Sequence, residues 1–331
     1  MSTIKEVAQL AGVSTATVSR IINGKGEASP ETINKVLKIV RELNYRPNSV
    51  AKSLSKQQSD LIALLIPNLD NPFFSELVKA IEKSANEQGY QIYLCNSEDN
   101  REKVEYYLEA MKDNYVAGAI INSLYVTEAD LDTLEASGIA TITIDRAQFL
   151  HPYSAVSIDH VTGGYLAAKH LIDTEKSKKL LFLSGPEQEK SSQDRYQGYL
   201  RAISENNVEH VGKLYGDFDI SSGYQLVYDF LAKDKSIDGI VSSNDAMALG
   251  ALRACKDLAV RVPEDIGIVG YDNISYGKYA IPRLTTVDQF KTKIGQTIMK
   301  ELIDVSQRKK SPKKYEIKPE IVTRDSTIKR S

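Results

Sequence analysis

Ten side chains beyond residue 60 combine aromatic faces with planar polar groups. Aromatic faces pack against the C–H surface of a sugar ring, and the planar groups of Asp, Asn, Gln and Arg bond neighbouring hydroxyls from both sides. These residue types therefore predict a binding site for a small uncharged sugar. The candidate ligands are Asn71, Phe73, Phe74, Asp145, Arg146, Arg195, Phe218, Asn244, Asp272 and Gln289.

Most of these residues follow an apolar segment of strand length, and amphipathic helical segments separate the strands. This alternation predicts parallel sheets, whose ligands bind beyond the carboxyl ends of the strands. A structural role is the alternative, because Asp145, Asn244 and Asp272 also suit helix caps and Phe73 or Phe74 suits a core. We expect Asp245 to be structural. The predicted strands lie near 61–67, 91–96, 117–122, 140–145, 179–184, 213–217, 238–243 and 266–271.

The patterns that catalysis or cofactor binding requires are missing from the sequence. It has no Gly-Lys phosphate loop, no Gly-x-Gly-x-x-Gly turn and no Ser/His/Asp arrangement. Asp145 and Asp272 imitate a hydrolytic carboxylate pair, yet two acids flanking a sugar also describe simple hydroxyl binding. We expect a protein that is not an enzyme and that holds no cofactor.

Histidines and cysteines do not stand at metal-ligand spacing anywhere in the chain. We therefore expect no metal site. The histidines are predicted to be surface residues or helix caps, and the cysteines to be reduced core thiols: His151, His160, His170, His210, Cys95 and Cys255.

The first 59 residues carry a different chemistry, because they hold nine Lys or Arg against four Asp or Glu. Their net charge is thus +5, and the rest must carry −7 for the whole chain to carry −2. A basic segment of this kind suggests an anion-binding arm on a soluble body, although a solvated surface is the plainer explanation.

Capping signals divide this arm into three short helices. Thr3 and Glu6 form a capping box, Gly12 permits a tight turn, and Ser14 caps a second helix. Ser29 with Pro30 begins a third helix. The first 45 residues are therefore predicted to form a three-helix bundle containing a helix-turn-helix.

In a helix-turn-helix, the second helix enters the major groove of DNA with its amino-terminal side chains toward the base edges. Thr15, Ala16 and Arg20 occupy these positions, and Arg20 has the geometry to bond guanine twice. Side chains suited to phosphates surround them. The predicted DNA contacts in this region are Thr3, Ser14, Thr15, Ala16, Thr17, Ser19, Arg20 and Asn23.

Two stretches closely resemble the headpiece and hinge of the lactose/galactose repressor family: TIKEVAQLAGVSTATVSRIING (3–24) and NYRPNSVAKSL (44–54). The body resembles ribose-binding and related sugar-binding proteins in NPFF (71–74), GDF (216–218) and VGYDN (269–273). This resemblance implies an α/β protein with a small all-α headpiece at 1–46, a hinge helix and linker at 47–60, and a two-lobed, periplasmic-binding-protein-like effector and dimerisation domain at 61–331. We place one lobe at about 61–159 and 290–318, and the other at about 160–288 and 320–331.

The hinge follows Pro47, and the segment Asn48 to Leu54 is shorter than the ~12 residues that a stable isolated helix requires. The resemblance implies that two hinge helices pair in a dimer and that Leu54 wedges into the minor groove. Asn48 and Leu54 therefore join the predicted DNA contacts. An inert tether is the alternative.

The resemblance also narrows the effector, and pentose-type ligands use these pocket positions. Gln193 stands where ribose binders place another arginine, which leaves the identity of the sugar open. A related purine repressor has a base-contacting arginine where this chain has Glu189. The alternatives to ribose are a different sugar, a phosphoprotein corepressor or a solute-binding protein without DNA binding.

Regulation of DNA binding by a sugar follows from the two-lobed fold, because lobe closure changes the spacing of the hinge helices across a dimer. No leucine heptad follows the core, so we expect a homodimer on a pseudo-palindromic operator. No apolar run approaches the ~20 residues of a membrane span and no secretion signal is visible. We expect a cytoplasmic protein.

Overall fold

The computed structural model describes residues 3–22, 24, 28–45, 58–145, 149, 154–307 and 311–328. The chain divides into two compact units, Met1–Ser59 and Asp60–Ser331, which are described separately. The predictions for Asn23, Asn48, Leu54, Arg146 and His151 lie outside the described residues.

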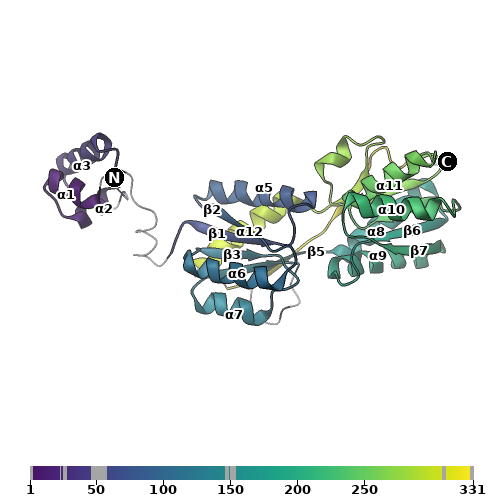
Figure 1. Cartoon of the computed structure of the whole chain (residues 1–331), viewed down its shortest axis with the longest axis horizontal. Helices are drawn as coiled ribbons and strands as arrows, with labels where there is room; N and C mark the ends of the chain where they lie inside the picture. Colours follow the sequence, from purple (N-terminus) through teal and green to yellow (C-terminus); the bar gives the residue numbers. More distant parts are fainter. Residues whose placement is uncertain are drawn as a thin grey trace. The chain divides into compact units, whose positions relative to one another are not determined.

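The described residues of the first unit include three helices, α1 (Ile4–Ala11), α2 (Thr15–Ile22) and α3 (Pro30–Glu42) (Figure 1). The predicted caps are present, since the Thr3 hydroxyl accepts a hydrogen bond from the Glu6 N–H and the Ser29 hydroxyl accepts one from the Thr32 N–H. Gly12 ends α1 with φ 71°, a backbone angle that favours glycine. A shared core holds the three helices together: Val7, Ala8, Ala11, Val18, Ile21 and Val36. The predicted three-helix bundle is confirmed.

The second unit contains two six-stranded sheets, each the centre of one lobe. In the first lobe the strand order is β11-β5-β4-β3-β1-β2, and every neighbouring pair is parallel. Helices cover both faces of this sheet (Figure 1). The elements of the first lobe are β1 (Leu61–Ile66), α5 (Pro72–Glu87), β2 (Gln91–Asn96), α6 (Arg101–Asp113), β3 (Gly118–Ile121), α7 (Glu128–Ala136), β4 (Ala140–Ile144), β5 (Ser154–Ile158), α12 (Lys291–Ser306) and β11 (Lys314–Ile317).

In the second lobe the strand order is β12-β10-β9-β8-β6-β7, and only the pairing of β10 with β12 is antiparallel within this sheet. A π-helical segment, Leu171–Glu175, continues α8, and a 3-10 helix, Ser275–Lys278, follows β9. The other elements are α8 (His160–His170), β6 (Lys179–Ser184), α9 (Lys190–Asn206), β7 (Glu209–Tyr215), α10 (Ile220–Leu231), β8 (Gly239–Ser242), α11 (Asp245–Asp257), β9 (Gly267–Tyr271), β10 (Thr285–Asp288) and β12 (Glu320–Val322).

The chain passes between the lobes three times: from β5 to α8, from β10 to α12, and from β11 to β12. All eight predicted strands are present, but β7 begins at Glu209 instead of near residue 213. Its first residues are polar, and it is an edge strand that pairs only with β6, so its hydrophobic signal is weak. Residues that follow most of these strands line the candidate site.

Candidate functional site

A cavity of about 510 Å³ lies between the two lobes of the second unit. Its volume falls within the range of small-molecule sites. Nine of the ten predicted ligands have side chains on its lining, and the tenth, Arg146, lies outside the described residues. The nine are Asn71, Phe73, Phe74, Asp145, Arg195, Phe218, Asn244, Asp272 and Gln289. The binding of an effector by these side chains stays a prediction.

Aromatic rings enter the cavity from both lobes. Phe73 and Phe74 begin α5, and their ring centroids lie 5.3 Å apart in an edge-to-face arrangement. Asn71 fixes this turn, because its side-chain oxygen accepts a hydrogen bond of 3.0 Å from the Phe73 N–H. Phe218 lies on the second lobe with φ 62°, and its ring occupies the space where a Cβ on Gly185 would stand, 2.2 Å away. Gly185, the residue after β6, therefore leaves room for the Phe218 ring because it has no side chain.

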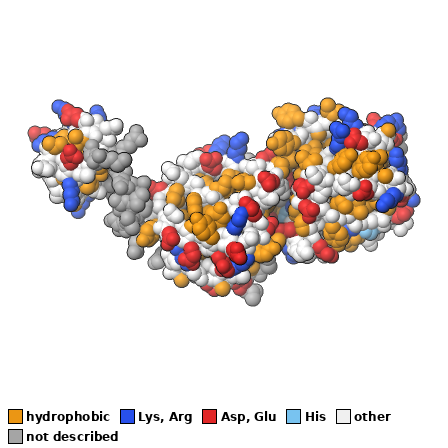
Figure 2. Space-filling view, in the orientation of Figure 1, with side chains coloured by type: hydrophobic (Ala, Val, Ile, Leu, Met, Phe, Trp, Pro, Cys, Tyr) orange, Lys and Arg blue, Asp and Glu red, His pale blue; other side chains and the backbone are white. Residues whose placement is uncertain are grey.

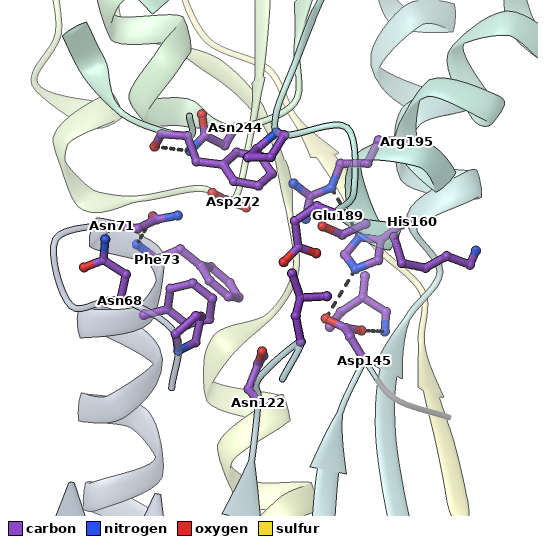
Figure 3. A pocket seen from close by; sticks show the side chains of 18 of the residues that line it. Asn68, Asn71, Phe73, Asn122, Asp145, His160, Glu189, Arg195, Asn244 and Asp272 are labelled. Atoms are coloured by element: carbon purple, nitrogen blue, oxygen red, sulfur yellow. Dashed lines mark hydrogen bonds and ion pairs between the residues drawn. The ribbon is translucent and has the colours of Figure 1, made fainter. Parts of the chain in front are cut away.

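A polar network crosses the cavity on the side of Arg195 (Figure 3). One Asp145 oxygen accepts a hydrogen bond from the Ile158 N–H, and the other lies 3.3 Å from Nε2 of His160. Arg195 Nε donates to His160 Nδ1 at 3.3 Å, so the neutral ring carries its proton on Nε2, facing Asp145. The network joins β4 of the first lobe to α8 and α9 of the second.

The pKa values of the titratable groups in this network are shifted by their surroundings. Burial lowers the pKa of His160, which favours the neutral ring. Burial alone would raise the pKa of Asp145, but the His160 ring, the Ile158 N–H and Arg195 outweigh it and lower the pKa. Asp145 is therefore a carboxylate that can accept hydrogen bonds from ligand hydroxyls.

Arg195 is held on three sides within the second lobe. Its guanidinium lies over the Tyr271 ring, with Cζ 3.9 Å from the ring centroid, and Nη1 donates to the Ser243 carbonyl at 2.6 Å. Burial leaves 6% of this residue exposed. The planar group is thereby fixed, which orders its remaining donors before a ligand arrives.

Asp272 is a buried carboxylate on the lining of the cavity. It accepts a hydrogen bond from the Gln289 amide, and the ammonium of Lys291 donates to the Asp272 carbonyl at 2.5 Å. Burial raises the pKa of Asp272 to about 6, against the opposing effects of Arg195, Lys291 and Gln289. A ligand hydroxyl that donates to this group stabilises its charged form.

Asn244 and Asp245 show how the cavity wall is built. The Asn244 side chain caps α11 through the Met247 N–H and donates to the Phe218 carbonyl at 2.8 Å. Asp245 accepts hydrogen bonds from the Thr286 hydroxyl and the Ile274 N–H, and it does not line the cavity. The prediction that Asp245 is structural agrees with these contacts. Asn244 serves as a cap and also faces the cavity.

Close packing of α8 against α9 positions His160 and Arg195. A Cβ on Gly164 would stand 1.9 Å from the Arg195 carbonyl oxygen, and one on Gly198 would stand 1.8 Å from the Val161 carbonyl oxygen. Real Cβ atoms do not approach backbone atoms so closely. Both glycines are therefore required for the two helices to meet at this distance.

The prediction for the histidines is wrong for His160, which is 5% exposed and lines the cavity. It begins α8 while Asp159 is the cap. His170 and His210 are also partly buried and bond Thr327 and Tyr196, respectively. No strong signal marked His160, because β5, the strand before it, contains two serines in SAVSI and was not predicted.

Other lining residues were also missed. Asn68 directly follows the predicted strand 61–67 and Asn122 is the last residue of the predicted strand 117–122, so the strand-end rule was sufficient to find them. The remaining side chains come from loops, from β5 and from the start of α9, where no local pattern marks them. Lining residues absent from the prediction include Asn68, Asp99, Asn122, Tyr125, Ser157, Gln188, Glu189, Lys190, Asp194 and Asp217.

The first unit presents the predicted DNA-contacting side chains on α2 and its amino-terminal cap. Thr15, Ala16 and Arg20 are exposed. The Ser14 hydroxyl lies 2.9 Å from the Thr17 hydroxyl and accepts a hydrogen bond from the Thr17 N–H. Ser14 thus acts as the cap of α2, and its contact with a DNA phosphate stays a prediction. Thr3 is likewise exposed and caps α1.

The described part of the chain can be searched for clusters of metal-ligating side chains and for paired cysteines. No group of three or more His, Cys, Asp or Glu gathers there in a way that could hold a metal ion. Cys95 and Cys255 are buried and unpaired with each other, and burial raises the pKa of each thiol to about 12. The prediction of reduced core thiols is confirmed. Within the described ranges, no helix has the length and apolar character needed to cross a membrane.

Comparison with known proteins gives two family matches. Residues 3–48 match the bacterial regulatory proteins of the lacI family, and residues 168–327 match the periplasmic binding protein-like domain. The two matches fall on the helical bundle and on the second lobe with its last passages between the lobes. They agree with the predicted combination of headpiece and two-lobed body.

Relatives cover the whole chain. A ribose operon repressor from Halalkalibacterium halodurans is 36% identical over 328 residues, which span 99% of this chain and 97% of that protein. The HTH-type transcriptional repressor PurR from Mannheimia succiniciproducens is 34% identical over 333 residues and 99% of each chain. The crystal structure of the lac repressor dimer bound to operator and the anti-inducer ONPF matches with a TM-score of 0.89, 29% identity and 99% coverage of each chain.

Similarity of this extent, together with the helix-turn-helix and the cavity between two parallel-sheet lobes, decides the family. It is a family of DNA-binding transcriptional repressors and not of enzymes. The chain belongs to the lacI family of bacterial regulatory proteins, with a DNA-binding headpiece and an effector-binding domain.

Proposed function

We propose that this chain is a sugar-responsive repressor of a carbohydrate-utilisation operon and that its effector is ribose. The observation that carries the proposal is the cavity, because it gathers aromatic rings and planar polar groups from both lobes. Phe73 and Phe218 offer faces for the C–H surface of a sugar ring. Asp145, Arg195 and Asp272 offer fixed acceptors and donors for its hydroxyls.

The identity of the sugar rests on two considerations. The relative from Halalkalibacterium halodurans is a ribose operon repressor, at 36% identity. The PurR relatives have similar identity, but Glu189 stands at the cavity where the resemblance to a purine repressor calls for a base-contacting arginine. A carboxylate cannot replace a cationic donor. Ribose is therefore favoured over a purine.

On the DNA side, we propose that a homodimer binds a pseudo-palindromic operator in the cytoplasm. Thr15, Ala16 and Arg20 read base edges in the major groove. Phosphates and the minor groove are contacted by Thr3, Ser14, Thr17, Asn23, Asn48 and Leu54. Thr15, Ala16 and Arg20 are exposed on one short helix, which supports this assignment, and the lac repressor relative is a dimer bound to operator.

Sugar binding and DNA binding are coupled through the two lobes. Asp145 and His160 lie on different lobes and meet at the cavity, and Glu76 of α5 accepts a hydrogen bond of 2.7 Å from the Ser275 N–H of the second lobe. A ligand held by both walls favours one arrangement of the lobes. Reciprocal linkage then requires the sugar and the operator to alter each other's affinity by the same factor.

Calorimetric titration of the purified full-length protein tests the effector. Ribose is compared with hexoses and disaccharides, and Asp272→Asn serves as the cavity variant. Ribose should bind as the tightest ligand, and the variant should weaken it by about tenfold or more, the typical cost of losing a hydrogen bond to a charged group. Tighter binding of another sugar would replace ribose as the effector. Silence with every sugar would reject a sugar effector and favour a protein corepressor.

A further inference from the structure

The ammonium of Lys291 joins the first lobe to the segment that follows β9. Lys291 is the first residue of α12, and its Nζ atom lies 3.3 Å from a carboxylate oxygen of Glu76 on α5. The same atom donates hydrogen bonds to the carbonyls of Asp272 at 2.5 Å and of Asn273 at 3.1 Å. An ammonium group has three N–H donors, so these three acceptors satisfy it completely.

Glu76 holds the same segment through its other carboxylate oxygen. Oε1 of Glu76 accepts a hydrogen bond of 2.7 Å from the Ser275 N–H, whereas Oε2 faces Lys291. Between these polar contacts, Ile274 is 1% exposed and packs in the hydrophobic core of the first lobe. All four residues of 272–275 in the second lobe therefore contact the first lobe.

The backbone of this segment has angles that residues with side chains rarely adopt. Asp272 has φ 108° and Asn273 has φ 51°, and residues other than glycine keep such angles only where their surroundings hold them. Lys291 contributes to this, because it binds both carbonyls. Gln289, on the passage of the chain from β10 to α12, donates to the Asp272 carboxylate. Residues of one passage therefore hold both the backbone and the side chain of Asp272.

The pair formed by Glu76 and Lys291 differs from charged groups at the surface. Figure 2 shows charged side chains on both sides of the boundary between the lobes on the visible face, where water and salt screen them. The side chains of Glu76 and Lys291 are only 25% and 12% exposed, so their charges are screened less. Lys291 Nζ also lies 5.8 Å from the centroid of the Phe73 ring. The pair thus adjoins two predicted sugar ligands but does not line the cavity.

We propose that Glu76 and Lys291 form a positioning pair: from the first lobe, they hold Asp272 of the second lobe in the geometry that binds the effector. This inference rests on the proposed function, in which Asp272 is a sugar ligand. Because both residues of the pair belong to the first lobe, a movement between the lobes changes their contacts with 272–275 together. A sugar bound to Asp272 then favours the arrangement in which these contacts are made.

The two charges of the pair act on Asp272 in opposite directions. Lys291 lowers the pKa of Asp272, and Glu76 raises it. Removal of each charge should therefore move the titration of Asp272 in opposite directions, upward without Lys291 and downward without Glu76. A general loosening of the fold would hydrate Asp272 and lower its pKa in both variants. Neither variant alters the other ionisable groups that face Asp272, which are Arg195 of α9, Asp245 of α11 and Tyr271 of β9.

Carboxyl-carbon NMR of the ligand-free full-length protein measures this titration, and Asp272→Asn identifies the signal. The variants are Lys291→Met and Glu76→Gln, and the glutamine keeps an acceptor for the Ser275 N–H. The wild-type midpoint should lie at about 6, Lys291→Met should raise it and Glu76→Gln should lower it. The matched controls should leave it unchanged, because they replace exposed residues of the same two helices: Lys293→Met on α12 and Glu82→Gln on α5.

Calorimetry with ribose at several pH values measures the consequence for the effector. At neutral pH, Lys291→Met should bind ribose about tenfold less tightly than the wild type, the typical effect of losing a hydrogen bond to a charged group. Affinity should begin to fall at a higher pH in Lys291→Met and at a lower pH in Glu76→Gln, because the sugar binds the charged form of Asp272. Lys291→Arg keeps a cation and should retain the wild-type pH profile.

Two results would overturn the positioning pair: titration midpoints that move in the same direction or not at all, and wild-type ribose affinity in Lys291→Met. If Lys291→Met does not fold, Glu76→Gln decides alone, by a midpoint that moves downward or one that does not. If no sugar binds the wild-type protein, the proposed function fails, while opposite shifts in the ligand-free titration still support the pair.

Discussion

The carboxylate of Asp145 on the first lobe lies 3.3 Å from the Nε2 atom of His160 on the second lobe. The two residues flank β5 and the first passage of the chain between the lobes. The same His160 ring accepts a hydrogen bond from Arg195 through Nδ1. One imidazole thus connects two predicted sugar ligands, each from a different lobe, and fixes the geometry of the cavity before a ligand enters.

Replacement of His160 by leucine removes both ring nitrogens and keeps a side chain of comparable bulk. Arg195 Nε then lacks its acceptor and Asp145 loses a neighbour, and an unsatisfied buried polar group costs about 1–3 kcal/mol. Sugar affinity measured by calorimetry should fall by about tenfold. His170→Leu is the control, because His170 bonds Thr327 away from the cavity. Equal loss of affinity in both variants would contradict a specific role for His160.

Asp272 should make sugar binding depend on pH. Its pKa in the folded chain is raised by burial from 3.8 to about 6, so below about pH 6 the ligand-free protein holds a proton there. A sugar hydroxyl that donates to the carboxylate must displace this proton, and affinity should fall by up to about tenfold per pH unit below pH 6. Calorimetry at several pH values measures the slope, and Asp272→Asn should abolish it. A slope that survives in the variant would assign the dependence to another group.

The raised pKa of Asp272 also makes the free energy of unfolding of the ligand-free protein depend on pH. The folded chain holds a proton on Asp272 that the unfolded chain releases near its ordinary pKa of 3.8. This group therefore lowers the free energy of unfolding progressively as pH rises from about 4 to about 6, and its effect is constant above that window. Urea unfolding of the ligand-free protein should show this decline in the wild type, and the decline should be smaller in Asp272→Asn.

Packing of α8 against α9 gives a test of how the cavity is positioned. Gly164→Ala places a methyl group 1.9 Å from the Arg195 carbonyl oxygen, which forces the helices apart and should destabilise the fold by at least about 2 kcal/mol. Sugar affinity should fall as well, because Arg195 and His160 move with their helices. Gly212→Ala is the control, since its nearest neighbour is the Leu181 side chain at 3.6 Å. Similar urea midpoints for both variants would refute the packing constraint.

Much of the fold was predictable because its signals are local. Thr3, Ser29 and Pro30 mark helix starts whose capping bonds the structure contains. The rule that ligands gather beyond strand ends placed Asp145 and Asp272 on one cavity. His160 was not predicted to belong to the site, because the strand before it, β5, is short and its serines interrupt the hydrophobic pattern of a strand. From the sequence, Glu189 could only be compared with the arginine of a related purine repressor. Its position at the cavity could not be predicted, because it depends on how α9 packs in the second lobe.

Direct base reading by the first unit is tested with Arg20→Ala. Loss of a bidentate contact to guanine should weaken operator binding by about 1–3 kcal/mol and relax selectivity at one base position. Lys38→Ala is the control, because Lys38 is exposed on α3 with its nearest acidic partner Glu42 on the same helix. Fluorescence anisotropy with a labelled operator and single-base variants measures both quantities. An equal loss on every base variant would reassign Arg20 to phosphate binding.

Leu54 lies outside the described residues, and its predicted wedge into the minor groove is open to a simple test. Leu54→Ala should weaken operator binding by a few kcal/mol, the scale of unstacking a base step. Calorimetry should find sugar binding by the same variant unchanged, because the cavity belongs to the other unit. An unchanged operator affinity would leave the hinge as an inert tether.

Control of DNA binding by sugar is measured most directly by fluorescence anisotropy. An operator fragment selected from genomic DNA is titrated with the full-length protein, with and without saturating ribose. The operator dissociation constant should change by at least about fivefold, the lower end of typical allosteric coupling, and Asp272→Asn should remove most of that change. An operator affinity that ribose and every other tested sugar leave unchanged would contradict a sugar-responsive repressor.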